Sequence, residues 1–177
     1  MIEEYSIPLA KIIKELGLRE VHLPCAAEEI LIRSRDVIRP GLELYGFCDY
    51  FDPHRITVLG RSEIAMLNSI GEEKKAAAID HFFALHPATV IVARGIDPCS
   101  FMREAAERYD IPLVSSKDST SNVVADLVSL LNVELAPRIT RHGVLIEVYG
   151  EGILLVGDSG VGKSETAIEL IKRGHRL

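Results

Sequence analysis

The chain has few of the residues that mark secreted or metal-stabilised small proteins. It contains 177 residues with no tryptophan, three cysteines and 6% aromatic residues. Cys25, Cys48 and Cys99 are odd in number and lack C-x-x-C spacing, which argues against a disulfide framework or a zinc knuckle. Free cysteines are typical of a reducing compartment, so the predicted location is the cytoplasm.

Long apolar runs and basic runs are also missing. No apolar stretch is long enough to cross a bilayer, and residues 1–5 lack the basic and then apolar layout of a signal peptide. The formal net charge of −6 argues against sequence-independent binding to nucleic acid. We therefore expect a protein that binds neither membranes nor nucleic acid. Its 47% hydrophobic and 26% charged residues fit a soluble globular protein.

The most informative segment present is a complete G-x-x-x-x-G-K-S motif, residues 157–164. It follows the apolar run 153–156, which predicts a buried strand, and precedes residues 165–173, whose apolar side chains recur at helical spacing. Glycines let the backbone curve so that its N–H groups face phosphate oxygens, and the following helix directs its positive end at the same anion. The motif therefore predicts a site for a nucleoside triphosphate or a similar polyphosphate.

Each residue of this phosphate-binding loop, or P-loop, is a candidate ligand-binding residue. Lys163 is expected at the β- and γ-phosphates, and the Ser164 hydroxyl is expected to ligate Mg²⁺. The predicted binding residues are Gly157, Asp158, Ser159, Gly160, Val161, Gly162, Lys163 and Ser164.

The rest of the chain alternates helical and strand patterns. Residues 1–132 are predicted to form a small α/β domain with a parallel or mixed sheet covered by helices. The first helix is expected to begin with Ser6 as its N-cap, and a second helix with Ser62 as its N-cap. Further helices are expected at 72–85, 101–109 and 120–131, and strands at 19–23, 29–33, 55–60, 88–93 and 111–114.

The final part of the chain begins a second domain. Residues 132–137 are predicted to form a linker because Pro137 ends the preceding helix. Residues 143–150 predict a strand that leads through the turn 150–152 into the P-loop strand, and so short a turn predicts an antiparallel hairpin. The predicted domains are 1–132 and 133–177, the second being the first hairpin, P-loop and helix of a P-loop kinase domain.

Four stretches in the same order make the sequence similar to HPr kinase/phosphorylase, a bacterial family that phosphorylates a serine of the phosphocarrier protein HPr. His142-Gly143, shortly upstream of the P-loop, is the most specific element of this resemblance. The stretches are 39–47, 55–60, 138–145 and 157–165. The resemblance covers the whole chain, and family proteins are longer, which implies an N-terminal domain and the start of the kinase domain.

The resemblance implies ATP and Mg²⁺ as cofactors and His142 and Lys163 as active-site residues. It implies phosphorylation of HPr, and the reverse reaction in which inorganic phosphate takes the phosphoryl group and pyrophosphate is released. A hexamer and a role in carbon catabolite regulation are also implied. The family's proton-accepting aspartate is expected just after Leu177, so the resemblance predicts a truncated form without that residue and without HPr kinase activity of its own.

Two alternatives to this interpretation stay open. Another P-loop kinase would place a parallel strand beside the P-loop strand, whereas residues 143–156 predict a hairpin. The second alternative is a non-enzymatic regulatory or assembly module that at most binds phosphate. For His142, the residues alone favour a histidine at the start of a strand that bonds to the backbone, and the resemblance favours the active-site role.

Overall fold

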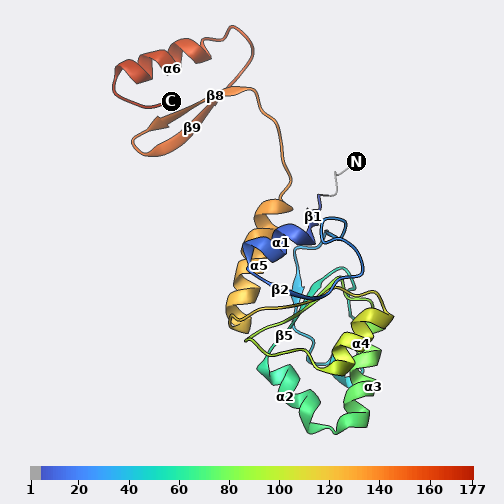
Figure 1. Ribbon diagram of the computed structural model, residues 1–177. Coiled ribbons are helices and arrows are strands. Elements are labelled where there is room, and N and C mark those ends of the chain that lie inside the picture. Colours follow the sequence, from blue (N-terminus) through green and yellow to red (C-terminus); the bar gives the residue numbers. More distant parts are fainter. Residues whose placement is uncertain (1–4) are drawn as a thin grey trace. The chain divides into compact units, whose positions relative to one another are not determined.

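The computed structural model describes residues 5–177 (Figure 1). The chain divides into two compact units, of which the first ends at Pro137 and the second comprises Arg138–Leu177. The domain limits expected from the sequence, 1–132 and 133–177, stay a prediction. Each unit is described by itself below.

A five-stranded mixed sheet forms the centre of the first unit, in the order β2-β7-β6-β5-β4. The last four strands of this order run parallel to one another, and β2 is antiparallel to β7. Their bounds are β2 Arg19–His22, β4 Val37–Ile38, β5 Ile56–Leu59, β6 Thr89–Val92 and β7 Leu113–Ser115. A separate antiparallel pair joins β1 (Ile7–Pro8) to β3 (Leu31–Ile32). The predicted α/β class with a parallel or mixed sheet is confirmed.

Helices cover both faces of this sheet (Figure 1). They are α1 Leu9–Glu15, α2 Arg61–Ser69, α3 Glu72–Phe83, α4 Ser100–Arg108 and α5 Thr120–Glu134, with a short 3₁₀ turn, η1, at Glu43–Tyr45. Apolar residues of α1 and α5 pack with Ile56, Val58 and Ile91 on one face. Apolar residues of α2, α3 and α4 pack with Leu59 and Val92 on the other. Burial on both faces explains the uninterrupted apolar runs of β5 and β6.

Two predicted N-caps are wrong because other contacts set the helix starts. Ser6 does not cap α1, since Ile7–Pro8 pairs with β3 and the helix begins only at Leu9. Ser62 lies inside α2, whose N-cap is Gly60. There the backbone N–H of Gly60 donates to the carboxylate of Glu63 at 2.8 Å, one half of a capping box.

The predicted linker at 132–137 is also partly wrong, because α5 continues to Glu134. The helix starts where the sequence predicts, and the hydroxyl of Ser119 accepts a hydrogen bond from the N–H of Asn122. Leu131 and Leu135 are both buried in the core on this face of the sheet. Apolar burial therefore extends the helix by about one turn towards Pro137.

The second unit consists of an antiparallel hairpin and one helix. Its elements are β8 Gly143–Val148, β9 Glu151–Val156 and α6 Lys163–Lys172. The hairpin is confirmed, but its turn is formed by Tyr149 and Gly150 rather than by residues 150–152. Both turn residues have positive φ, +53° and +86°, as in the two-residue turns whose twist matches that of paired strands.

No helix within residues 5–177 is long and apolar enough to cross a membrane.

Glu63 joins three segments of the first unit, and its removal tests their coupling. The Glu63 carboxylate is 8% exposed and accepts hydrogen bonds from the N–H of Gly60 and, at 2.9 Å, from Arg39. Glu63→Ala leaves both donors without this acceptor, so we expect a loss of about 1–3 kcal/mol in the free energy of unfolding. Urea denaturation of the 177-residue chain, followed by circular dichroism, measures it. The control is Glu107→Ala at an exposed position on α4; equal losses in the two variants would contradict the coupling.

Candidate phosphate-binding site

The P-loop connects β9 to α6, as the motif requires. β9 ends at Val156 and α6 begins at Lys163, so residues 157–162 form the connection. Gly160 and Gly162 have φ of +83° and +91°, in a region that side chains with a Cβ rarely adopt. Gly162 is the N-cap of α6. These two glycines therefore shape the turn from strand to helix.

The side chain of Lys163 folds back over the start of the loop. Its Nζ donates hydrogen bonds to the carbonyl oxygens of Gly157 at 2.8 Å and Asp158 at 2.7 Å. An ammonium group has three N–H donors, so one remains for a further acceptor. The loop thus holds a positive charge at its mouth, beside the positive end of the α6 dipole.

Ser164 and Thr166 differ in the use of their hydroxyl groups. Thr166 Oγ1 donates to the carbonyl oxygen of Gly162 at 2.9 Å, which ties the first turn of α6 to the loop. Ser164 is exposed, and its hydroxyl has no hydrogen-bond partner among residues 5–177. A hydroxyl oxygen in this state fits the metal-ligand role expected from the sequence.

Two carboxylates flank the same loop. Asp158 lies within the loop and Glu165 in the first turn of α6, and both are exposed. Their negative charges oppose the binding of an anion, so a divalent cation bound with the anion would offset part of this repulsion. No group of three or more His, Cys, Asp or Glu side chains suited to a metal ion occurs within the described residues. A metal ion here would therefore depend on Ser164 together with oxygens of the bound anion.

The hairpin register determines where His142 lies. Gly143 pairs with Val156, so His142 and Gly157 each lie one residue beyond this pair, at the same end of the hairpin. His142 is exposed. The structure therefore brings the predicted histidine and the start of the P-loop to one end of the sheet.

Gly143 has a steric role in the hairpin that the sequence motif does not reveal. A Cβ at this position would come within 2.7 Å of the carbonyl oxygen of Leu155, closer than real Cβ atoms approach. Glycine is therefore required for the two strands to approach at the end that carries His142 and the loop. In the sequence, this steric requirement corresponds to the glycine that directly follows His142.

β8 also pairs with a residue that follows α6. Glu147 and Arg176 exchange backbone hydrogen bonds at 2.7 and 3.2 Å in an antiparallel bridge. β8 is thus flanked by β9 on one side and by the segment after α6 on the other. The chain leaves the P-loop strand, forms α6, and returns to the sheet parallel to β9.

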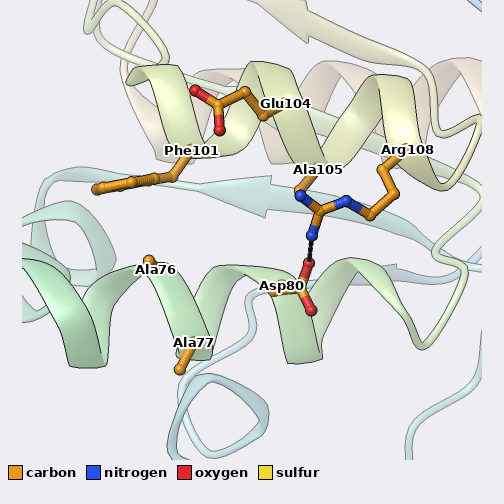
Figure 2. A pocket seen from close by; sticks show the side chains of 7 residues that line it. All are labelled: Ala76, Ala77, Asp80, Phe101, Glu104, Ala105 and Arg108. Atoms are coloured by element: carbon orange, nitrogen blue, oxygen red, sulfur yellow. Dashed lines mark hydrogen bonds and ion pairs between the residues drawn. The ribbon is translucent and has the colours of Figure 1, made fainter.

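The first unit has a groove of about 360 Å³ between α3 and α4, shown in Figure 2. Ala76, Ala77 and Ala105 are among its lining residues. Asp80 pairs with Arg108 and also accepts a hydrogen bond from the Tyr109 hydroxyl at 3.0 Å. This ion pair is internally balanced and joins the two helices, so we assign the groove a structural role.

Cys48 and His81 form another polar contact in the first unit, with Sγ 3.5 Å from Nε2. Burial, followed by the nearby charges of Glu43 and Asp49, raises the pKa of the Cys48 thiol. A raised pKa lowers the fraction of thiolate, the reactive form, at neutral pH. The pair therefore lacks the character of an activated nucleophile.

The close approach at Gly143 can be tested by adding a single methyl group. Gly143→Ala forces the hairpin to shift, so we expect a loss of about 1–3 kcal/mol in the stability of the second unit. Amide hydrogen exchange of β8 and β9 measures it as faster exchange at the end next to the P-loop. Gly152→Ala is the matched control, because nothing lies within 4 Å of a Cβ there. Unchanged exchange in Gly143→Ala would show that the strands tolerate a side chain.

Family models match both parts of the chain. Residues 7–131 match the model described as HPr serine kinase N terminus, and residues 133–177 match the model described as HPr serine kinase C-terminal domain. One solved structure, the CBS and DRTGG domains of the regulatory region of Clostridium perfringens pyrophosphatase with its activator diadenosine tetraphosphate, is similar with a TM-score of 0.52. It is 14% identical, and the match covers 73% of this chain and 50% of that chain, which shows a shared fold alone.

Curated relatives named HPr kinase/phosphorylase are similar over most of this chain. The protein of Caldicellulosiruptor bescii is 43% identical over 169 residues, which are 96% of this chain and 54% of the relative. That of Leptospira biflexa is 49% identical over 146 residues, 82% of this chain and 45% of the relative. This chain thus spans about half the length of the curated relatives that it matches. The two family models and these identities show that the chain belongs to the HPr serine kinase family.

Proposed function

We propose that the second unit binds ATP and Mg²⁺ as the nucleotide-binding part of an HPr serine kinase/phosphorylase. The observation that carries this proposal is the position of the Lys163 ammonium, held on the carbonyl oxygens of Gly157 and Asp158 at the N-terminus of α6. Two of its three N–H groups are used by the loop, and the third is available for a phosphate oxygen. The open loop N–H groups and the helix dipole add to the attraction for phosphate.

The residues present suit MgATP. Lys163 would hold the β- and γ-phosphates, and the unpaired Ser164 hydroxyl would ligate Mg²⁺. The loop residues 157–162 would contact phosphate oxygens through backbone N–H groups, which need no particular side chain at positions 158, 159 and 161. Bound MgATP supplies the phosphoryl group that the kinase direction transfers.

The chain's own residues would position this group and offset its charge. Phosphoryl transfer depends mainly on placing the reactants and stabilising charge on the phosphate oxygens. Lys163 supplies a fixed positive charge, and the end of α6 supplies a partial one. His142 is exposed at the same end of the hairpin as the loop, where its ring could donate a hydrogen bond to a phosphate oxygen. We therefore assign His142 and Lys163 to the active site.

HPr is the proposed protein substrate, and the relatives' name supports both reaction directions. In the kinase direction a serine hydroxyl of HPr would attack the γ-phosphorus, a neighbouring carboxylate would take its proton, and the bond from the γ-phosphorus to the β–γ bridging oxygen would break to release ADP. In the reverse direction inorganic phosphate attacks phosphoserine, the serine oxygen regains a proton, and pyrophosphate leaves. The resemblance assigns the proton to an aspartate that no residue of 1–177 matches, so these residues supply nucleotide binding rather than the complete reaction.

The cellular location, regulatory role and oligomeric state are also proposed from the family resemblance. The protein would act in the bacterial cytoplasm in carbon catabolite regulation, as part of a hexamer. The domain limits 1–132 and 133–177 belong to this proposal. The antiparallel neighbour of the P-loop strand and the family assignment both disfavour the alternative of a different P-loop kinase.

Nucleotide binding can be tested with a pair of lysines at opposite ends of α6. Lys163→Ala removes a charge-assisted hydrogen bond to phosphate, so we expect about a tenfold to hundredfold weaker Kd for MgATP. Isothermal titration calorimetry of the 177-residue chain measures it. Lys172→Ala is the control, because Lys172 is exposed in the last turn of α6 and should leave the affinity unchanged. Absent binding by the parent chain, or equal losses in both variants, would contradict the proposal.

Phosphoryl transfer is tested separately with purified HPr. We expect the 177-residue chain to bind MgATP without forming phosphoserine on HPr, because no residue of 1–177 takes the role of the proton acceptor. Incubation with radiolabelled ATP and HPr, followed by electrophoresis, measures transfer. A full-length relative is the positive control. Labelled HPr in the reaction with the 177-residue chain would show that these residues already contain a complete catalytic set.

A further inference from the structure

The first unit contains a small cavity that takes no part in the proposed nucleotide site. Its volume is about 120 Å³, and it lies among α2, the first turn of α3, the segment after β6, and α4. Four apolar side chains form its walls, and Lys75, Asn68 and Asp97 contribute polar groups. The apolar wall residues are Ile64, Leu67, Ile96 and Met102.

Lys75 is the unusual member of this lining. It is only 9% exposed, and lysine is rarely buried to this extent unless its charge is paired. Its one ion pair among residues 5–177 is with Glu72, 3.5 Å away, and that carboxylate is 74% exposed. The ring of Phe101 lies 6.0 Å from Nζ, at the limit of a cation–π contact. The Lys75 ammonium therefore has only these two weak contacts among residues 5–177.

Asp97, the other charged residue of the lining, is already engaged. Hydrogen bonds from Arg19 at 2.6 Å and Arg103 at 2.9 Å hold the pKa of Asp97 below its ordinary value. Its carboxylate thus stays negative and directed to two guanidinium groups. Lys75 and Glu72 balance each other, and Asp97 with its two arginines carries a net charge of +1, so the charges around the cavity favour an anionic over a cationic ligand.

The apolar walls and the volume of the cavity limit the size and polarity of the anion that fits it. A cavity of roughly 150 Å³ can hold a six-carbon ring, so a cavity of about 120 Å³ suits a ligand of about five or six heavy atoms. A compact polar anion such as phosphate would leave the four apolar wall residues without a partner and lose its hydration. A carboxylate with a short aliphatic tail satisfies Lys75 at one end and the apolar wall at the other.

We propose that this cavity binds a short-chain aliphatic carboxylate through a hydrogen-bonded ion pair with Lys75. Asn68, at the rim, has an amide with no partner among the described residues and can donate to the second carboxylate oxygen. The site lies in the segments that follow the carboxyl ends of β5 and β6.

Titration of the 177-residue chain with butyrate tests the proposal at constant ionic strength. Methyl resonances of the cavity wall, from Ile64, Leu67, Ile96 and Met102, are followed by nuclear magnetic resonance. Those of Ile12, on the opposite face of the sheet, serve as an internal reference. We expect saturable shifts at the wall alone, with butyrate binding at least about tenfold tighter than its neutral isostere butyramide.

Lys75→Met should weaken butyrate binding at least about tenfold while preserving the fold, because methionine fills a similar volume without a charge. Lys74→Met, at the exposed neighbouring position, should leave binding unchanged. The absence of saturable wall shifts in the parent chain, or equal affinity for butyrate and butyramide, would overturn the proposal. Equal affinity for phosphate and butyrate would overturn the choice of an aliphatic carboxylate. None of these measurements involves ATP, so they are independent of the nucleotide-binding test.

Discussion

The pairing of Gly143 with Val156 is the contact on which the candidate site depends. It fixes the register of the hairpin, and with it the end of the sheet at which both His142 and the P-loop emerge. Because side chains alternate across a strand, a shift of one residue would turn every side chain of the strand to the opposite face. The close backbone approach at Gly143 makes such a shift costly, since only glycine fits opposite the carbonyl oxygen of Leu155. The geometry of the candidate phosphate site thus depends on a backbone contact outside the P-loop.

Much of the fold could be predicted from the sequence, because the elements carry strong periodic signals. β5 and β6 are apolar at nearly every position, since both faces of the sheet are covered, and α3, α4 and α5 show apolar residues at helical spacing. The strand, glycine-rich loop and helix around residues 157–164 were equally clear, because the backbone conformation there demands particular residues. The antiparallel hairpin followed from the length of its connection.

The remaining features depend on contacts between distant parts of the chain. β1 and β4 have two residues each, too few for a periodic pattern, and they form because partner strands are available. Serine is a favoured N-cap residue, so Ser6 and Ser62 are natural candidates. Strand pairing at Ile7 delays the start of α1, and the carboxylate of Glu63 sets the start of α2 at Gly60. The burial of Lys75 could not be predicted either, because the residues that line the cavity with it come from three other segments. Sequence patterns report local preference and cannot report which charges become enclosed.

β8, flanked by β9 and Arg176, is an interior strand, and this leaves β9 at the margin of its small sheet. Within the described part of the chain, β9 pairs only with β8, so its outer row of backbone donors and acceptors is open. Leu154 and Val156 are exposed on the same strand. An open strand edge with apolar side chains is a template for pairing with another chain. The strand that leads into the candidate phosphate site is therefore also an edge at which this unit could associate with another chain.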